Sequence, residues 1–471
     1  MATMEATMPA ADTPQASTNG VNGHNFDTTT MNGDAEGTVA PGLSADEMAL
    51  YDRQIRLWGA KAQEQIRRAK VLLISLRAVG TEIAKNLTLA GIQELTIVDS
   101  DEVTEDDLGA QFFLREEDIG KPRAEAAIPR IQELNPRVKV RSEGSLQDLL
   151  MKDQTYYAPF SCVIACDHDI MTLSTINTAA RFASRPFYAA GIHGFYGYIF
   201  ADLVGHEFVI EREKSNVPTT IKAETMTRSV VSVTNRKENN GKTTEIVKKA
   251  EVYCPLILAN SSPLPMEVMS NRRKLKAVSP LLPCLRALFD FQREQSQLPD
   301  LNRKEHIIRF SELAKQKTAE LLLPPDTLNG EFLKSFMQNM GSEITPTAAF
   351  VGGRLSEDVI NVLGNREQPI QNFALFDGDS LDGRIYSLYS MPPELMAFDP
   401  MLQPLDGGMV GMTGQLDATQ INGGMQTNSG MQNDGGMQNN SGMQNGGDLS
   451  NVMPPANPNN NIDMPNPGQP N

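Results

Sequence analysis

The residues with the clearest chemical potential lie in a short turn between an apolar run and a helical pattern. Residues 70–75, KVLLIS, are typical of a strand buried on both faces, and residues 80–90 have the apolar spacing of a helix. Such a turn binds phosphate when it has the pattern Gly-x-Gly-x-x-Gly, because glycine lets the backbone approach the anion at the start of the helix. Here the three positions hold Ser75, Arg77 and Gly80, so two of the three glycines are replaced.

Two interpretations of this turn are open. Arg77 could give a phosphate a charged contact, or its side chain could fill the pocket while the turn serves only packing; we favour the second. Asp99 ends the next expected strand, where a ribose-binding carboxylate would stand, although acids are common at strand ends. Asp167 follows the apolar run VIAC and could either hold a metal ion beside a phosphate or be a solvated loop residue.

The elements that must position these residues alternate between strand and helix. We expect strands at 70–75, 94–99, 138–141, 162–165 and 186–190, and helices at 47–69, 80–90, 123–134 and 170–184. This order predicts an α/β fold with a doubly wound, mostly parallel, Rossmann-like sheet. Further on we expect short antiparallel pieces over 206–270, helices broken at prolines over 279–340, a helix over 346–364, and a closing hairpin with a long loop between strands 372–376 and 384–388.

Composition limits the classes of protein that the chain can be. The 471 residues carry 42 basic and 58 acidic side chains, and a net charge of −16 argues against nucleic-acid binding. The four cysteines form no CxxC pair, which favours buried thiols in a reducing compartment over a zinc site or a disulfide scaffold. We find no secretory signal and no apolar stretch of 18 residues, so no contact with a membrane is expected.

Both ends of the chain differ in composition from its middle. Residues 1–45 and 399–471 contain acids but no Lys or Arg. Residues 423–447 form a degenerate Gly/Met/Gln/Asn repeat, which is either a partner-binding segment or a low-complexity extension without a function of its own. We expect disordered tails, because such sequences bury too little apolar surface to offset chain entropy. The predicted organisation is a tail (1–45), a core (46–205), an irregular and helical excursion (206–345), a closing helix and hairpin (346–392) and a low-complexity tail (393–471).

Several longer stretches resemble the family of enzymes that activate ubiquitin-like modifiers. They are YDRQIRLWG (51–59), VLLISLRAVGTEIAKNLTLAGIQELTIVDSDEV (71–103), GAQFFL (109–114), GKPRAEAAIPRIQELNP (120–136), AGIHGFYGYIFADLVGHEF (190–208) and PTAAFVGGRLSEDVINVLGNREQPIQNFALFDG (346–378). The resemblance implies a ThiF/MoeB-type adenylation fold, shared with bacterial proteins that activate sulfur carriers. Within the family the chain is most similar to the small, non-cysteine subunits of heterodimeric SUMO-activating enzymes.

The resemblance implies that this chain is the degenerate half of a pseudosymmetric pair. Active halves carry Asn-x-x-Arg-Gln-Phe, whose Asn and Arg contact nucleotide, and the matching residues here are Asp107 and Ala110. Arg123 stands where active halves have a phosphate-binding Lys, and Asp167 matches their magnesium-binding Asp. We therefore expect residues 46–205 to be a pseudo-adenylation core that by itself binds no nucleotide productively and no metal, with ATP and Mg²⁺ held by the partner.

The thioester cysteine is also expected in the larger, cysteine-bearing partner subunit. A nucleophilic cysteine needs an exposed, electropositive setting that lowers its pKa. Cys162 and Cys166 end an apolar strand, Cys284 lies in an apolar helix, and Cys254 only loosely resembles a Cys-Pro site. Each is better interpreted as a buried structural thiol.

The motif YDRQIR leaves one candidate catalytic residue, Arg53. The resemblance implies that Arg53 reaches across the subunit interface to the γ-phosphate in the partner's pocket, as an arginine finger supplied in trans. The alternative is that Arg53 and Arg56 form surface ion pairs with Asp52 or other acids. The implied partners are the large subunit, SUMO itself and, indirectly, a conjugating enzyme.

Three rival functions remain at this point. They are the degenerate subunit of a Nedd8-activating enzyme, a self-sufficient sulfur-carrier adenylyltransferase and a non-catalytic scaffold of the same fold. The family also implies a nuclear location, with a share in the cytoplasm. The basic run NRRKLK (271–276) is either a nuclear address or an ordinary solvated helix face.

Overall fold

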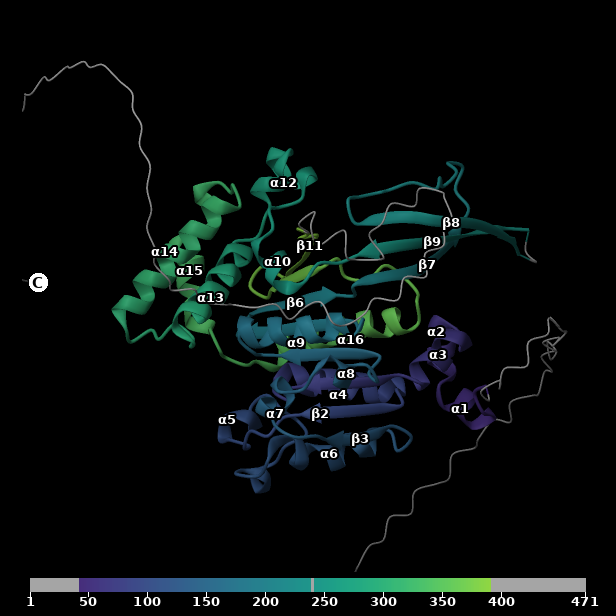
Figure 1. Cartoon of the computed structure of the whole chain (residues 1–471), viewed down its shortest axis with the longest axis horizontal. Coiled ribbons are helices and arrows are strands. Elements are labelled where there is room, and N and C mark those ends of the chain that lie inside the picture. Colours follow the sequence, from purple (N-terminus) through teal and green to yellow (C-terminus); the bar gives the residue numbers. More distant parts are fainter. Residues whose placement is uncertain (1–41, 239–240, 391–471) are drawn as a thin grey trace, which may run out of the picture. The chain divides into compact units, whose positions relative to one another are not determined.

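A large mixed sheet organises the part of the chain that the computed structural model describes, residues 42–238 and 241–390. Its order is β11-β10-β6-β5-β4-β1-β2-β3 (Figure 1). The five strands from β3 to β5 are parallel, and β6, β10 and β11 continue the sheet in antiparallel fashion. The strands are β1 (Lys70–Ile74), β2 (Glu94–Val98), β3 (Lys139–Ser142), β4 (Cys162–Cys166), β5 (Phe187–His193), β6 (Tyr196–Asp202), β10 (Phe373–Asp377) and β11 (Asp382–Tyr386).

Helices cover both faces of this sheet, as the alternation in the sequence predicts. The principal layers are α4, α6 and α16 on one face and α9 and α13–α15 on the other. The helices are α1 (Ala45–Leu50), α2 (Asp52–Trp58), α3 (Ala60–Arg67), α4 (Ala78–Ala90), α5 (Glu105–Leu108), α6 (Arg123–Leu134), α7 (Leu146–Leu150), α8 (Gln154–Tyr157), α9 (Ile170–Phe182), α10 (Leu256–Ser261), α11 (Met266–Met269), α12 (Arg272–Lys276), α13 (Leu281–Gln295), α14 (Lys304–Glu320), α15 (Gly330–Asn339) and α16 (Thr345–Leu363), with 3₁₀ turns η1 (Glu116–Asp118) and η2 (Pro325–Thr327).

Strand β1 shows why the apolar run folds at the centre. Successive side chains of a strand point to opposite faces, and all four apolar residues of β1 are fully buried. Leu72 and Ile74 join the core under α9 and α13, whereas Val71 and Leu73 join the core under α4 and α16. The doubly wound prediction is confirmed.

The N-terminal helical region differs from its prediction. A single helix over 47–69 is wrong, because the segment forms α1, α2 and α3 with breaks at Tyr51 and at Gly59, whose φ is 87°. Helix α1 also begins at Ala45, inside the predicted tail, where Ser44 and Glu47 form a reciprocal capping box. Of the predicted tails, residues 1–41 and 393–471 lie outside the described residues.

The middle of the chain is more regular than expected. The predicted antiparallel pairing is confirmed, but the strands are long rather than short and form a separate three-stranded sheet of order β7-β9-β8. The strands are β7 (Gly205–Glu213), β8 (Arg228–Lys237) and β9 (Thr243–Val252). Cross-strand ion pairs such as Arg212–Glu245 and Arg228–Glu251 join these polar strands. Strand β6 was not predicted, and the loop between β10 and β11 has four residues rather than the long loop expected. The breaks predicted near Pro299 and at Pro324 are confirmed by the gaps between α13, α14 and α15.

No helix in the described ranges is both long enough and apolar enough to span a membrane.

Gly91, the residue after the end of α4, packs closely against Tyr51, the residue before α2. Gly91 has φ 82°, and a Cβ there would stand 2.5 Å from the Tyr51 hydroxyl oxygen. Gly120 has φ 80°, but a Cβ added to it would meet no atom within 4 Å. Gly91→Ala should therefore lower the free energy of unfolding by about 1–3 kcal/mol more than Gly120→Ala, which carries only the backbone strain. Urea unfolding of the full chain, followed by fluorescence of its single tryptophan, Trp58, measures both; equal losses would contradict the contact.

Candidate functional site

The turn after β1 keeps the shape of a phosphate-binding turn without two of its glycines. Ser75 has φ 72°, the left-handed region that glycine prefers. Gly80 lies so close to the turn that a Cβ there would stand 2.2 Å from the Ser75 carbonyl oxygen. The third glycine is therefore required by packing, whatever the turn binds.

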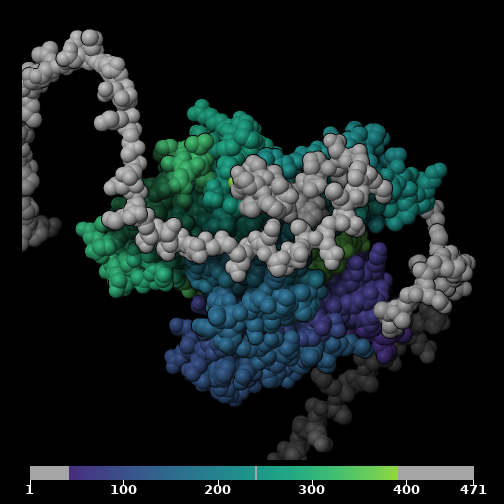
Figure 2. Space-filling view, in the orientation of Figure 1, coloured from purple at the N-terminus to yellow at the C-terminus, as the bar shows by residue number. Residues whose placement is uncertain are grey.

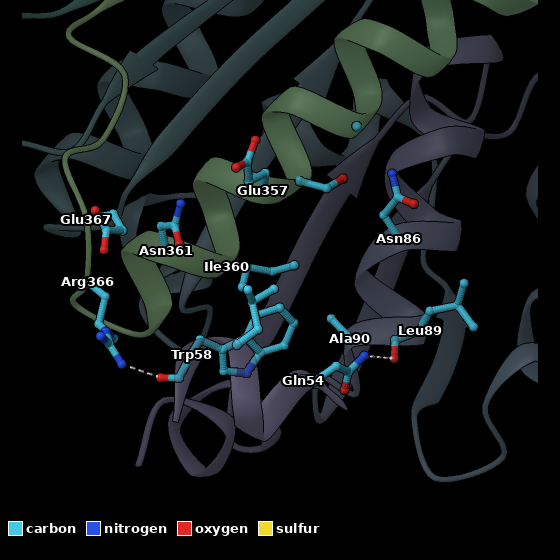
Figure 3. A pocket seen from close by; sticks show the side chains of 13 residues that line it. Gln54, Trp58, Asn86, Leu89, Ala90, Glu357, Ile360, Asn361, Arg366 and Glu367 are labelled. Carbon is cyan, nitrogen blue, oxygen red and sulfur yellow. Dashed lines mark hydrogen bonds between the residues drawn. The ribbon is translucent and has the colours of Figure 1, made fainter. Parts of the chain in front are cut away.

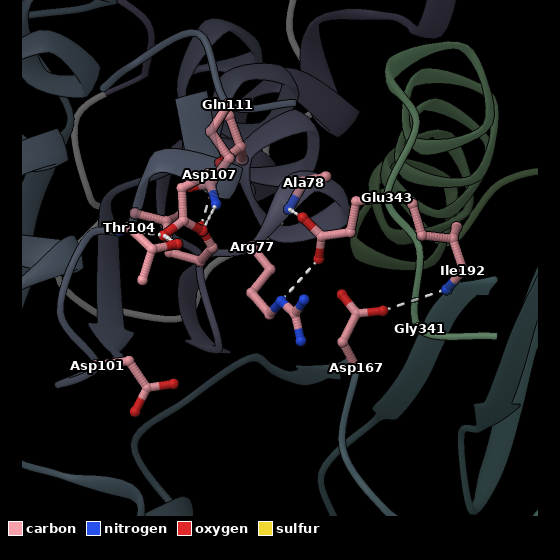
Figure 4. Close-up of polar contacts among 12 residues, drawn as sticks. Arg77, Ala78, Asp101, Thr104, Asp107, Gln111, Asp167, Ile192, Gly341 and Glu343 are labelled. Atoms are coloured by element: carbon pink, nitrogen blue, oxygen red, sulfur yellow. Dashed lines mark hydrogen bonds and ion pairs between the residues drawn. The ribbon is translucent and has the colours of Figure 1, made fainter. Parts of the chain in front are cut away.

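Arg77 does not point into an open phosphate site. Its Nε lies 2.7 Å from Oε1 of Glu343, which comes from the segment just before α16 (Figure 4). The other oxygen of Glu343 accepts a hydrogen bond of 3.3 Å from the amide of Ala78, the first residue of α4. Burial raises the pKa of Glu343 above its usual range, and the positive charge of Arg77 acts in the opposite direction. Sequence reasoning missed Glu343, because no local pattern links two residues so far apart in the chain.

Asp99 is engaged by the protein itself rather than left for a ribose. Its carboxylate accepts a 2.6 Å hydrogen bond from the amide of Leu76 and lies 2.8 Å from Nη1 of Arg123. Arg123 also lies 3.3 Å from Asp107. Burial opposes the charge of Arg123, but attraction to Asp99 and Asp107 outweighs burial and raises the pKa of the guanidinium. Ala110 is buried beside this cluster and brings no charge to it.

Asp167 lies at the end of β4 and faces the same region. It has φ 57°, and its Oδ1 accepts a 3.2 Å hydrogen bond from the amide of Ile192. Its Oδ2 is buried with no hydrogen-bond partner among the described residues, as is Nε2 of His168. Burial first, and the charge of Glu343 second, raise the pKa of Asp167 to about 7.

The space left in this region is too small for a nucleotide. The cavity that Arg77, Asp167, His168, His193 and Glu343 help to line has a volume of about 130 Å³, whereas small-molecule sites usually measure about 300–1,000 Å³. No group of three or more His, Cys, Asp or Glu in the described ranges is arranged to hold a metal ion. As these side chains stand, the cavity is smaller than the sites that usually hold a nucleotide.

Arg53 lies on the exposed side of α2, a helix that contacts the C-terminal end of α4 through Gln54 and Leu89. Arg56 of the same helix pairs with Asp52 at 3.1 Å, so the surface-pair alternative is correct for Arg56. Arg53 makes no ion pair or side-chain hydrogen bond with any described residue, and its side chain is exposed. A charged, unpaired guanidinium on this helix can interact with a group outside the chain.

Helix α2 is held firmly at three points. The Tyr51 hydroxyl accepts a 2.9 Å hydrogen bond from Asn135, and Gln54 donates to the carbonyl of Leu89 at 3.1 Å. At the other end, Arg366 donates to the carbonyl of Trp58 at 2.8 Å (Figure 3). These anchors fix the helix that carries Arg53. Sequence reasoning did not single them out.

A groove of about 500 Å³ lies beside α2, between α4 and α16 (Figure 3). Its wall includes Leu57, which is 76% exposed, and Leu89, which is 44% exposed. Apolar side chains at this exposure, next to an unpaired arginine, are typical of a surface that another protein covers.

The four cysteines do not have a nucleophile's surroundings. All are buried, and burial raises the pKa of each thiol, to about 12 for Cys254. A thiol whose pKa is raised in this way is almost entirely protonated at neutral pH, so almost no nucleophilic thiolate is present.

The buried carboxyl of Asp167 predicts a pH-dependent stability. The folded chain holds the Asp167 proton up to about pH 7, whereas the unfolded chain loses it near pH 4. This stabilising contribution is complete below about pH 4 and is lost as pH rises through about 7. Asp167→Asn keeps the acceptor for Ile192 and tolerates the positive φ, so it should have a higher melting temperature than the wild type at pH 8, with a difference that shrinks toward pH 5.

A matched variant, Asp326→Asn, removes an exposed carboxylate and should change melting temperature about equally at both pH values. Equal pH profiles for the wild type and Asp167→Asn would contradict the raised pKa.

Comparison with known proteins places this geometry in a family. The ThiF family profile matches residues 51–393. The chain is 41% identical to the DNA damage tolerance protein RHC31 of Saccharomyces cerevisiae, over 72% of this chain and 96% of that protein. It is 34% identical to the human SUMO-activating enzyme subunit 1, over 74% of this chain and 96% of that protein. It is also 34% identical to the DNA damage tolerance protein rad31 of Schizosaccharomyces pombe, over 74% and 98% of the two chains. The chain therefore belongs to the ThiF family.

Proposed function

We propose that this chain is the non-cysteine subunit of a heterodimeric SUMO-activating enzyme. The relatives named SUMO-activating enzyme subunit 1 match it along almost their whole length. The observation that carries the proposal is the combination of an unpaired Arg53 on an anchored, exposed helix with a nucleotide pocket that its own side chains fill. Such a chain has no complete site of its own but can complete a site on another subunit.

In this assembly the large, cysteine-bearing partner holds ATP and Mg²⁺, and this chain binds neither productively. The enzyme adenylates the C-terminal glycine of SUMO and forms a thioester on the partner's cysteine, from which a conjugating enzyme receives SUMO. Arg53 reaches the γ-phosphate in the partner's pocket. A planar, permanently charged guanidinium suits this task, because it stabilises charge spread over phosphate oxygens. The groove between α2, α4 and α16 provides apolar surface for the subunit interface.

ATP–pyrophosphate exchange with SUMO tests the proposal. We expect exchange only when this chain and the large subunit are mixed. Arg53→Ala should lower the exchange rate about 10²–10³-fold, because one charged donor to the reacting phosphates is lost. Arg53→Lys should be intermediate, since lysine keeps the charge but not the fork. The melting temperature should stay unchanged, because the Arg53 side chain makes no contact that holds the fold.

Arg56→Ala is the matched control, since Arg56 is exposed on the same helix but pairs with Asp52. It should keep nearly full exchange. Exchange by this chain alone would instead indicate a self-sufficient adenylyltransferase. Exchange unaffected by Arg53→Ala would indicate a scaffold, and a preference for Nedd8 over SUMO would indicate the Nedd8-activating rival.

We also propose that the chain acts in the nucleus, with a share in the cytoplasm. Helix α12, which projects at the top of the view in Figures 1 and 2, presents four exposed basic side chains without ion pairs to any described residue, namely those of Arg272, Arg273, Lys274 and Lys276. An uncompensated basic surface of this kind supports recognition by an import receptor.

The nuclear fraction of a fluorescent fusion tests this surface. Replacing Arg272, Arg273 and Lys274 together by Ala should shift the fusion toward the cytoplasm. Replacing the exposed Lys304 and Lys315 should leave it in place. An unchanged distribution of the α12 variant would contradict a role for α12 in import.

A further inference from the structure

The carboxylate of Glu343 lies where a phosphate would lie in a working turn. The first amides of a helix have no partner within the helix, and the helix dipole favours an anion beside them. Arg77, the N-cap of α4, forms no side-chain hydrogen bond that caps the helix. Instead, Glu343 Oε2 accepts from the amide of Ala78 at 3.3 Å, while its Oε1 pairs with Arg77 at 2.7 Å (Figure 4). A carboxylate from a segment far away in the sequence is therefore the hydrogen-bond acceptor for the first amide of α4.

The segment that carries Glu343 is fastened to the end of the sheet. The amide of Gly341 donates to Nδ1 of His193 at 3.2 Å, and the amide of Gly194 donates to the carbonyl of Ser342 at 2.8 Å. Burial lowers the pKa of His193 to about 4, so its ring is neutral and can accept this bond at neutral pH. These two bonds, made by consecutive residues where β5 ends, fix the approach of Glu343 to α4.

The remaining cavity keeps polar groups that no described residue satisfies. The Oδ2 atom of Asp167 and the Nε2 atom of His168 are both buried without partners, and both residues line the 130 Å³ space beside Glu343. Buried polar atoms normally have hydrogen-bond partners. These two atoms mark polar space beside Glu343 that a larger polar group can enter.

We propose that Glu343 is a tethered anion that occupies the phosphate subsite at the start of α4, and that its removal opens a binding site for pyrophosphate and similar phosphate anions. This inference deepens the proposed function, because it explains how the chain excludes nucleotide from its own pocket. Arg77, released from its partner, supplies the charged contact to the bound anion. The exclusion is then made by one side chain as well as by the missing glycines.

Isothermal titration of the full chain with inorganic pyrophosphate tests the proposal. A site that is filled most of the time by its own side chain binds a competitor weakly, in proportion to the open fraction. Glu343→Ala should therefore bind pyrophosphate about tenfold more tightly than the wild type, or better. Adding Arg77→Ala to that variant should abolish the gain. Glu331→Ala removes an exposed acid from α15 and should behave like the wild type.

Equal affinities for the wild type and Glu343→Ala would overturn the proposal, and so would a gain that survives Arg77→Ala. If Glu343→Ala does not fold, Glu343→Ser replaces it in the same titration, because serine also removes the carboxylate and vacates the space beside Ala78 while staying polar. It too should bind more tightly than the wild type, and an unchanged affinity would overturn the inference. Failure here is distinguishable from failure of the proposed function, since the exchange assay depends on Arg53 and on the partner's pocket.

Discussion

Helix α4 is the element on which the rest of the arrangement depends, because side chains from elsewhere satisfy both of its ends. At its start, Glu343 accepts from the first amide. At its end, the carbonyls of Thr88, Leu89 and Ala90 accept hydrogen bonds from Asn135, Gln54 and Gln63. Two of these three donors belong to the helices around Arg53, and the third also binds the Tyr51 hydroxyl. The start of α4 therefore borders the cavity beside Arg77, and its end holds α2, the helix that carries Arg53. Gly80 makes this possible by letting α4 approach the end of β1.

Local patterns in the sequence were sufficient to predict the parallel half of the sheet. Apolar runs such as 70–75 are buried on both faces, and their period and length identify them as strands. The three strands β7–β9 were underestimated, because their polar residues pair across strands and give little apolar alternation. The split of the first predicted helix depends on local breaks at Tyr51 and Gly59, and only the second involves a glycine with positive φ. The partners of Arg77 and Asp99 were beyond prediction, since they depend on contacts between segments far apart in the chain.

The loss of the phosphate-binding glycines did not remove the need to satisfy the turn. Ser75 keeps a left-handed backbone, which costs residues other than glycine, asparagine and aspartate about 1–2 kcal/mol. The helix start still requires an acceptor, and Asp99 still requires a donor. Glu343 is the acceptor at the helix start and pairs with Arg77. Arg123 is the donor to Asp99. The turn is thus bordered by paired charges, Arg77 with Glu343 and Arg123 with Asp99 and Asp107. Buried charges of this kind persist only as pairs, because an unpaired one is strongly destabilising.

The burial of all four cysteines has a consequence for oxidative chemistry. Peroxide and disulfide exchange act on exposed thiolates, and the thiols of Cys162, Cys166, Cys254 and Cys284 offer neither the charge nor the access. When the folded chain is exposed to peroxide or oxidised glutathione, no sulfenic acid, mixed disulfide or glutathione adduct should form at any of these positions. In the folded chain, oxidation should fall instead on exposed methionines such as Met151 and Met226.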